Sequence, residues 1–296
     1  MHLLAATPGR IEDGSVAVDL GQTPGEIVVL SAADSELACL AAAQRRLVAS
    51  DPGAARLRLA SLLRLGHHYS VDRYVETVLS EARLVVVRLL GGTAYWRYGV
   101  ERLAELARDR GLKLALLPGD DQPDAELAAR STLPAEAARR LWRYLAEGGI
   151  GNAEEFLRYA GSLIGRSLAW REPAPLLRAG LYWPGREHPS VAELRAAWRS
   201  EAPVAAIIFY RALVQAGNLK GIDALIAALA ERGLNPLPLF ALSLKDAQAA
   251  AIIAAALAEA PPDIVLNATG FSVAAPGEAH RAGVLEAADC PVLQVI

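Results

Sequence analysis

The sequence lacks the motifs that identify nucleotide-binding proteins and the common hydrolases. No G-x-x-x-x-G-K-[ST] phosphate loop and no G-x-G-x-x-G dinucleotide fingerprint occurs in the 296 residues. The G-x-S-x-G nucleophile elbow and the paired cysteine spacing of zinc sites are missing too. The sequence alone therefore identifies no catalytic residue.

Cysteine, aromatic residues and surplus charge are also scarce. The chain has two cysteines, Cys39 and Cys290, 6% aromatic residues and a net charge of -3. Two distant cysteines do not favour a disulfide, and the charge balance is unlike that of nucleic-acid-binding proteins. The Ala-rich run Ala249–Ala258 is far shorter than the roughly 20 residues that span a bilayer, and the first residues do not resemble a signal peptide. We expect a cytoplasmic protein.

Short apolar runs alternate with longer segments of helical period. Glu26–Leu30, Arg83–Leu90 and Lys113–Leu117 are nearly continuous apolar runs, which are typical of parallel strands covered on both faces. A helical stripe between the last two runs ends at Gly111. This pattern predicts a doubly wound, Rossmann- or flavodoxin-like α/β unit over residues 1–123.

The strand pattern fades and then returns. Helical patterns cover 133–147 and 153–168, and prolines punctuate 173–189. Strand-like runs resume at Pro203–Tyr210, Leu237–Leu242 and Asp263–Leu266. We predict a mainly helical connector over 124–200 and a second doubly wound unit over 201–296. The apolar run at 291–296 has no polar tail, and we interpret it as an interrupted strand of a longer protein.

The two α/β stretches can be overlaid without a gap. Arg83–Leu117 falls on Ala205–Leu239, and the helix end at Gly111 falls on Gly233. Either the chain contains a duplication, or any two strand–helix–strand segments align in this way.

Ligands of open parallel sheets bind beyond the carboxyl ends of the strands, so the loops there are candidate sites. Gly91 and Gly92 permit close approach of the backbone to a ligand. Tyr95 and Trp96 follow and can stack on a large flat ligand, while amides at the helix start favour anions. A tight turn with packed aromatics explains the same residues.

Two adjacent histidines, His67 and His68, are candidate metal ligands. Neighbouring residues of a strand point to opposite faces, so both could bind one ion only in an irregular loop. A surface or packing role accounts for them equally well.

In the second unit we assign a ligand-binding role to Tyr210, Arg211, Asn267, Gly270 and Phe271, which follow predicted strands. Arg211 suits a carboxylate or phosphate on a ligand, or a structural ion pair. Asn267 and Gly270 also fit an ordinary turn.

Several long stretches resemble one family. They are Asp13–Ala41, Arg88–Leu103, Leu181–Gly185, Pro203–Asp246 and Asp263–Gly277. In this order they resemble the CobN family, the large subunits of aerobic cobaltochelatase, which are related to the magnesium chelatase large subunit. The resemblance covers essentially the whole chain, although family members are several times longer.

The resemblance implies a ligase that forms nitrogen–metal bonds in cobalamin (vitamin B12) biosynthesis. The full assembly inserts Co2+ into hydrogenobyrinic acid a,c-diamide, and the AAA+ partners CobS and CobT hydrolyse ATP. It also implies that this chain is the head, neck and truncated start of the body, that it binds no cofactor itself, and that it gates substrate or docks partners without catalysing the reaction. The alternative is a free-standing, two-lobed small-molecule binding module.

Overall fold

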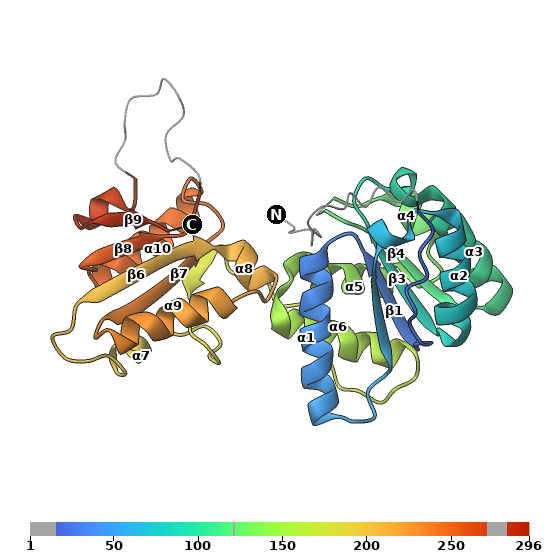
Figure 1. Ribbon diagram of the computed structural model, residues 1–296, viewed down its shortest axis with the longest axis horizontal. Helices are drawn as coiled ribbons and strands as arrows, with labels where there is room; N and C mark the ends of the chain where they lie inside the picture. The colour runs from blue at the N-terminus through green and yellow to red at the C-terminus, as the bar shows by residue number, and fades with distance from the viewer. Residues whose placement is uncertain (1–15, 121, 271–282, 296) are drawn as a thin grey trace, which may run out of the picture. The chain divides into compact units, whose positions relative to one another are not determined.

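The computed structural model describes residues 16–120, 122–270 and 283–295. The chain divides into two compact units, Met1–Pro175 and Leu176–Ile296. Each unit has its own largely parallel sheet, so the predicted α/β class is confirmed (Figure 1). The division between the units differs from the predicted boundaries at 123 and 200, because helices expected in a connector pack against the first sheet.

The first unit contains a four-stranded parallel sheet. Its strands are β1 (Ile27–Ser31), β2 (Leu57–Ser61), β3 (Leu84–Leu89) and β4 (Lys113–Pro118), in the order β2-β1-β3-β4. Every residue of β1 and β3 is buried. The continuous apolar runs therefore form central strands that are covered on both faces.

Helices cover both faces of this sheet. One face carries α1 (Asp34–Ser50), α5 (Ala135–Glu147) and α6 (Gly149–Leu163). The other carries α2 (His68–Thr77) and α3 (Arg97–Arg110). Shorter elements are η1 (Leu62–Leu65), η2 (Val78–Glu81), η3 (Thr93–Trp96) and α4 (Ala125–Arg130).

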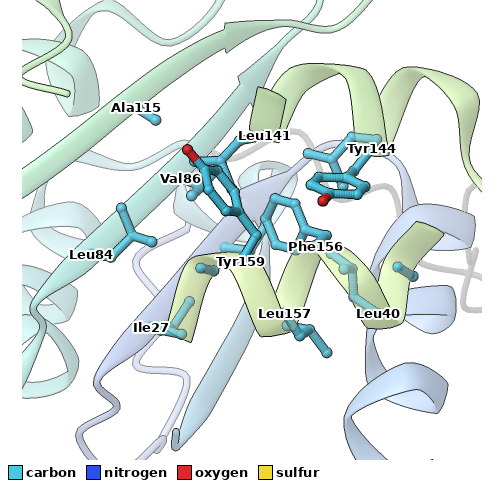
Figure 2. Close-up of a cluster of buried hydrophobic side chains, with 14 of the residues drawn as sticks. Ile27, Leu40, Leu84, Val86, Ala115, Leu141, Tyr144, Phe156, Leu157 and Tyr159 are labelled. Atoms are coloured by element: carbon cyan, nitrogen blue, oxygen red, sulfur yellow. The ribbon is translucent and has the colours of Figure 1, made fainter. Parts of the chain in front are cut away.

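The helices α5 and α6 complete the core of the first unit. Figure 2 shows Tyr144, Phe156 and Tyr159 in the same cluster as Leu84 and Val86. Burying an aromatic side chain contributes about 1.5–3 kcal/mol. The helices α5 and α6 of the predicted neck are thus part of the first unit, whereas the neck residues from 176 onward belong to the second unit.

The second unit contains a five-stranded sheet. Its strands are β5 (Ala179–Leu181), β6 (Val204–Tyr210), β7 (Asn235–Ala241), β8 (Ile264–Asn267) and β9 (Val292–Gln294). The order is β5-β7-β6-β8-β9, and only the β5–β7 pair is antiparallel among the described strands. The helices are α7 (Val191–Arg195), α8 (Arg211–Gln215), α9 (Lys220–Glu231), α10 (Ala247–Glu259) and η4 (Glu286–Ala288).

The second sheet is also doubly wound. Ile222 and Ile226 of α9 pack on one face, and Ile253 and Leu257 of α10 pack on the other. The order β7-β6-β8-β9 repeats the order β2-β1-β3-β4 of the first unit.

The structure also clarifies the gapless overlay. β4 and β7 begin at the overlaid residues Lys113 and Asn235, and Gly111 and Gly233 both have positive φ (64° and 83°). However, β3 is the third parallel strand of its sheet whereas β6 is the first parallel strand of the other, and the strand order matches β6 with β1. The overlay therefore compares strands with different places in their sheets, which favours the general strand–helix–strand explanation.

Within the residues that the structure describes, no helix is both long enough and apolar enough to cross a bilayer. Cys39 and Cys290 are free cysteines. Burial raises the pKa of the Cys39 thiol to about 11, so this thiol is protonated and poorly nucleophilic at neutral pH.

Candidate functional site

One candidate site of the first unit lies at the topological switch point of its sheet. From β1 the chain leads through α1 to β2 on one side, and from β3 it leads through α3 to β4 on the other. Ligands of doubly wound sheets bind where the connections diverge in this way. A cavity of about 330 Å³ is present at this point, and we call it the switch-point crevice; its lining includes Ser31, Ala33, Glu36, Arg88, Tyr95 and Gly119.

Arg88 forms one wall of the switch-point crevice. Its side chain is only 8% exposed and forms an ion pair with the equally buried Glu36. The guanidinium also donates to the carbonyls of Leu145 (3.1 Å), Gly119 (3.1 Å) and Pro118 (3.3 Å). Arg88 therefore joins β3 to α1, α5 and the end of β4, and its donors are directed at protein acceptors.

Glu36 is less completely satisfied than Arg88. Its Oε2 accepts from Arg88, but its buried Oε1 has no hydrogen-bond partner among the described residues. Glu36 is the third residue of α1, the position at which a glutamate pairs with an N-cap serine or threonine in a capping box. The N-cap residue of α1 is Ala33, which has no side-chain hydroxyl, so this capping box is not formed. A buried acceptor without a donor costs about 1–3 kcal/mol, so this oxygen, which is closed off from solvent, lowers the stability of the first unit.

The rim of the crevice is apolar. Leu90 is 55% exposed and Tyr95 is 45% exposed, and both line the cavity. A Cβ atom on Gly119 would lie 2.7 Å from the Leu90 nitrogen. The loop after β4 thus lies directly against the end of β3, and only glycine fits there without movement.

The predicted glycines lie in a different hollow. Gly91 and Gly92 have φ values of 91° and 70° and line a cavity of about 340 Å³ with Asp120, Asp124 and Glu126. Asp124 caps α4 through two backbone amides, and Glu126 accepts from Thr93 at 2.9 Å. Carboxylates around the hollow oppose the binding of an anion by the amides at the following helix start, which was one expectation for this loop.

The two predicted aromatics have separate roles. Tyr95 lines the switch-point crevice. Trp96 is 7% exposed in the core, and its indole Nε1 donates to the carbonyl of Leu65 at 2.7 Å. The structure supports the packed-aromatic explanation for Trp96, because protein atoms cover the ring that was expected to stack on a ligand.

The two histidines have local structural partners. His67 is the N-cap of α2 and accepts from the Tyr69 amide through Nδ1 at 3.1 Å. His68 stacks on Tyr98 with a centroid distance of 3.9 Å. Among the described residues, no group of three His, Cys, Asp or Glu side chains is placed to hold a metal ion. The structure therefore does not join the histidines to further ligands.

Three predicted residues of the second unit meet at the ends of β6 and β8. The Tyr210 hydroxyl accepts from the Gly270 amide at 2.9 Å. Asn267 accepts from the Thr269 amide and hydroxyl and donates to Gln294 at 3.0 Å. Arg211 begins α8 and donates to the Leu176 carbonyl at 3.4 Å. Phe271 lies outside the described residues.

Sequence reasoning missed the residues that form the switch-point crevice, Ser31, Glu36 and Arg88. One signal was available, since Arg88 interrupts the apolar run Arg83–Leu90. A charged residue inside a buried strand requires a partner of opposite charge. The identity of that partner depended on the docking of α1, which the sequence did not specify.

Comparisons with known proteins agree along the whole chain. The CobN/Magnesium Chelatase family model matches residues 142–296. The chain is 47% identical to the aerobic cobaltochelatase subunit CobN of Sinorhizobium sp, with 100% of this chain and 24% of that protein covered. It is 44% identical to CobN of Pseudomonas aeruginosa, with 100% and 23% covered.

A solved structure also matches. The catalytic subunit of cobaltochelatase from Mycobacterium tuberculosis superposes with a TM-score of 0.66 and 26% identity, over 90% of this chain and 21% of that one. The chain thus spans about a quarter of the length of the curated CobN proteins that it matches. On the family model and these relatives, the chain belongs to the CobN/magnesium chelatase family.

Proposed function

We propose that the chain is the N-terminal part of the large subunit of an aerobic cobaltochelatase. The observation that carries the proposal is 47% identity over the entire chain to a CobN protein. The superposition on a cobaltochelatase catalytic subunit supports it, since 90% of the chain follows that fold.

In the full assembly, the proposed reaction is the insertion of Co2+ into hydrogenobyrinic acid a,c-diamide during cobalamin biosynthesis. Insertion requires a group that accepts the pyrrole protons and ligands that transfer the cation to the macrocycle. We assign these groups to the rest of the large subunit, because this chain accounts for 24% of the matched CobN protein. ATP hydrolysis is assigned to the separate AAA+ partners CobS and CobT.

The proposed role of this chain is to gate substrate entry or to dock the ATPase partners. Both roles suit α/β units whose buried cores make them rigid. The roles differ in their kinetic consequences. A gate changes the KM for the macrocycle, whereas a docking surface changes the affinity for CobS and CobT.

The test compares the full-length subunit with the same subunit lacking residues 1–175. Cobalt insertion is followed by absorbance in the presence of CobS, CobT, ATP, Co2+ and the macrocycle. We expect insertion to fall at least about tenfold, through KM for a gate or through partner affinity for docking. Unchanged insertion by the shortened subunit, or insertion by residues 1–296 without the remaining chain, would contradict the proposal.

A further inference from the structure

The strand β9 forms an open edge of the second sheet. It is the end member of the order β5-β7-β6-β8-β9 and pairs in parallel with β8. The Pro291 carbonyl and the Val295 amide bond to β8, each at 2.9 Å. Because the backbone groups of successive strand residues alternate between the two sides, the N–H and C=O groups of Val292 and Gln294 point away from β8. Among the described residues, these outward groups have no hydrogen-bond partner.

The side chains of β9 are open as well. Every residue of the strand is exposed, with exposed fractions of 41% for Val292 and 51% for Leu293. Successive side chains of a strand point to opposite faces, so an apolar side chain lies open on each face. The strand contains no charged residue of the kind that protects sheet edges from pairing. The edge at β9 is therefore suited to pairing with an extended segment.

The first unit shows how an edge at the equivalent place is closed. β4 is the end member of the matching order β2-β1-β3-β4. Thr132 accepts from the Leu114 amide through its hydroxyl and donates its own amide to the Leu114 carbonyl, both at 2.8 Å. The Ser131 hydroxyl accepts from the Leu116 amide at 2.9 Å. The segment that contains Ser131 and Thr132 thus satisfies the outward groups of alternate residues of β4.

The faces of β4 are closed in the same unit. Leu114 and Leu116 belong to one core cluster and Ala115 and Leu117 to the other, and each is at most 2% exposed. The helices α5 and α6, which follow β4 in the sequence, provide part of this cover. Among the described residues, β9 has the place of β4 in the strand order without an equivalent cover of its edge or its faces.

We infer that the outer edge of β9 binds an extended segment of the large subunit that lies outside residues 1–296. The segment bonds to the outward backbone groups of Val292 and Gln294, as a strand does when it is added to an exposed sheet edge. Apolar side chains that accompany it cover Val292 and Leu293. The inference rests on the proposed function in one respect, namely that the chain is part of a CobN large subunit, of which it spans 24%.

The test compares hydrogen exchange in the 296-residue chain and in the full-length large subunit, by mass spectrometry with residue resolution. We expect the amides of Val292 and Gln294 to exchange at least about a hundredfold more slowly in the full-length subunit, because the added segment accepts from them. The outward amides of Leu114 and Leu116 should be protected in both proteins, and they serve as the internal control.

Three outcomes would overturn the inference. Fast exchange at β9 in both proteins would show that the edge stays open in the subunit. Slow exchange in both proteins would show that residues 1–296 close the edge themselves. Slow exchange in the 296-residue chain that becomes fast on dilution would assign the edge to a second copy of the chain.

A matched pair of variants tests the backbone pairing directly. Val292→Pro removes an outward N–H group and leaves the bonds to β8 in place, whereas Val292→Thr keeps the N–H group. In the full-length subunit, Val292→Pro should speed exchange of the Gln294 amide at least about tenfold, and Val292→Thr should change it less than about threefold. In the 296-residue chain the two variants should exchange alike at Gln294. Equal effects of the two variants in the full-length subunit would contradict pairing at this edge.

These measurements are independent of cobalt insertion. If the subunit lacking residues 1–175 inserts cobalt normally, the proposed gating or docking role fails, but the comparison at β9 still holds because β9 belongs to the second unit. If insertion falls as expected while β9 exchanges equally in both proteins, only the inference about the edge fails.

Discussion

In the first unit, the ends of β1 and β3 frame a crevice with a buried ion pair, whereas in the second unit the ends of β6 and β8 are joined by neutral hydrogen bonds. The register makes the contrast direct. Ser31 of β1 lies beside Arg88 of β3, and Ile208 of β6 lies beside Asn267 of β8. The same strand order therefore supports two different polar arrangements at equivalent places.

The group formed by Asn267, Thr269 and Gln294 and the pair formed by Glu36 and Arg88 differ in how fully their own polar atoms are satisfied. Asn267, Thr269 and Gln294 bond to one another in the second unit. In the first unit Glu36 retains an unpartnered buried oxygen. A satisfied network stabilises its own fold, whereas a buried acceptor without a donor costs free energy.

The largest expected effect concerns the buried ion pair. Arg88→Met leaves Glu36 as an uncompensated buried charge, and should lower the free energy of unfolding of the first unit by about 3–5 kcal/mol. Native-state hydrogen exchange measures it on the amides of β1 and β3, with those of β6 and β8 as the internal control. The double variant Arg88→Met, Glu36→Leu should recover the part of the loss that comes from the unpaired charge of Glu36, but not the part that comes from the three carbonyls that lose the Arg88 donor. A decrease in the free energy of unfolding of less than about 1 kcal/mol would contradict the conclusion that the Arg88–Glu36 ion pair stabilises the first unit.

A smaller effect is expected at the opposite end of the first sheet. Glu26 accepts from the Arg56 amide at 3.1 Å and from Arg166 at 2.9 Å. These contacts hold the pKa of the Glu26 carboxyl below its usual value, chiefly through the Arg56 amide. The stabilisation is therefore present above the unfolded-state pKa and is lost as the pH falls through the lower folded-state pKa.

Accordingly, Glu26→Gln should lower the free energy of unfolding of the first unit by about 1–3 kcal/mol at pH 7. The decrease should be smaller below about pH 4, where the wild-type carboxylate is increasingly protonated. Urea titrations monitored by exchange in β1 at several pH values measure both quantities. Glu81→Gln is a suitable control, because this exposed partner of Arg56 should contribute little. A cost that stays constant down to pH 3 would show that the charge of Glu26 is not responsible.

The smallest effect is expected in the second unit. Tyr210→Phe removes the hydroxyl that accepts from the Gly270 amide, and should cost about 0.5–1.5 kcal/mol. Hydrogen exchange of the β6 and β8 amides measures this loss of stability. Exchange of the amides in the first unit should not change. A loss as large as that of Arg88→Met would remove the contrast between the two switch points.

The sequence predicted the elements better than their packing. Arg83–Leu90 and Pro203–Tyr210 read correctly as buried strands because a continuous apolar run has few alternatives. We predicted a connector over residues 124–200 because a helical sequence pattern indicates a helix but does not indicate which sheet that helix packs against. For α5 and α6 that information lies in tertiary contacts with α1 and the first sheet.

Site prediction was limited for the same reason. Tyr95 lies in η3 after β3 and lines a cavity, and its ligand-binding role stays a prediction. Trp96, its neighbour, points into the core, since one step along a helical turn changes the face of the residue. Glu36 resembled an ordinary helix-start residue until the fold placed Arg88 beside it.

The contacts of Arg88 also have a consequence for the order of folding. The side chain bonds to Glu36, Gly119 and Leu145, which lie 52, 31 and 57 residues away in the chain. These contacts require three separate loop closures, and each adds an entropic cost before the contact forms. We therefore expect the guanidinium to reach its final partners after α1, β4 and α5 have docked. Because interactions that form late mainly slow unfolding, we expect Arg88 to affect the unfolding rate of the first unit more than its folding rate.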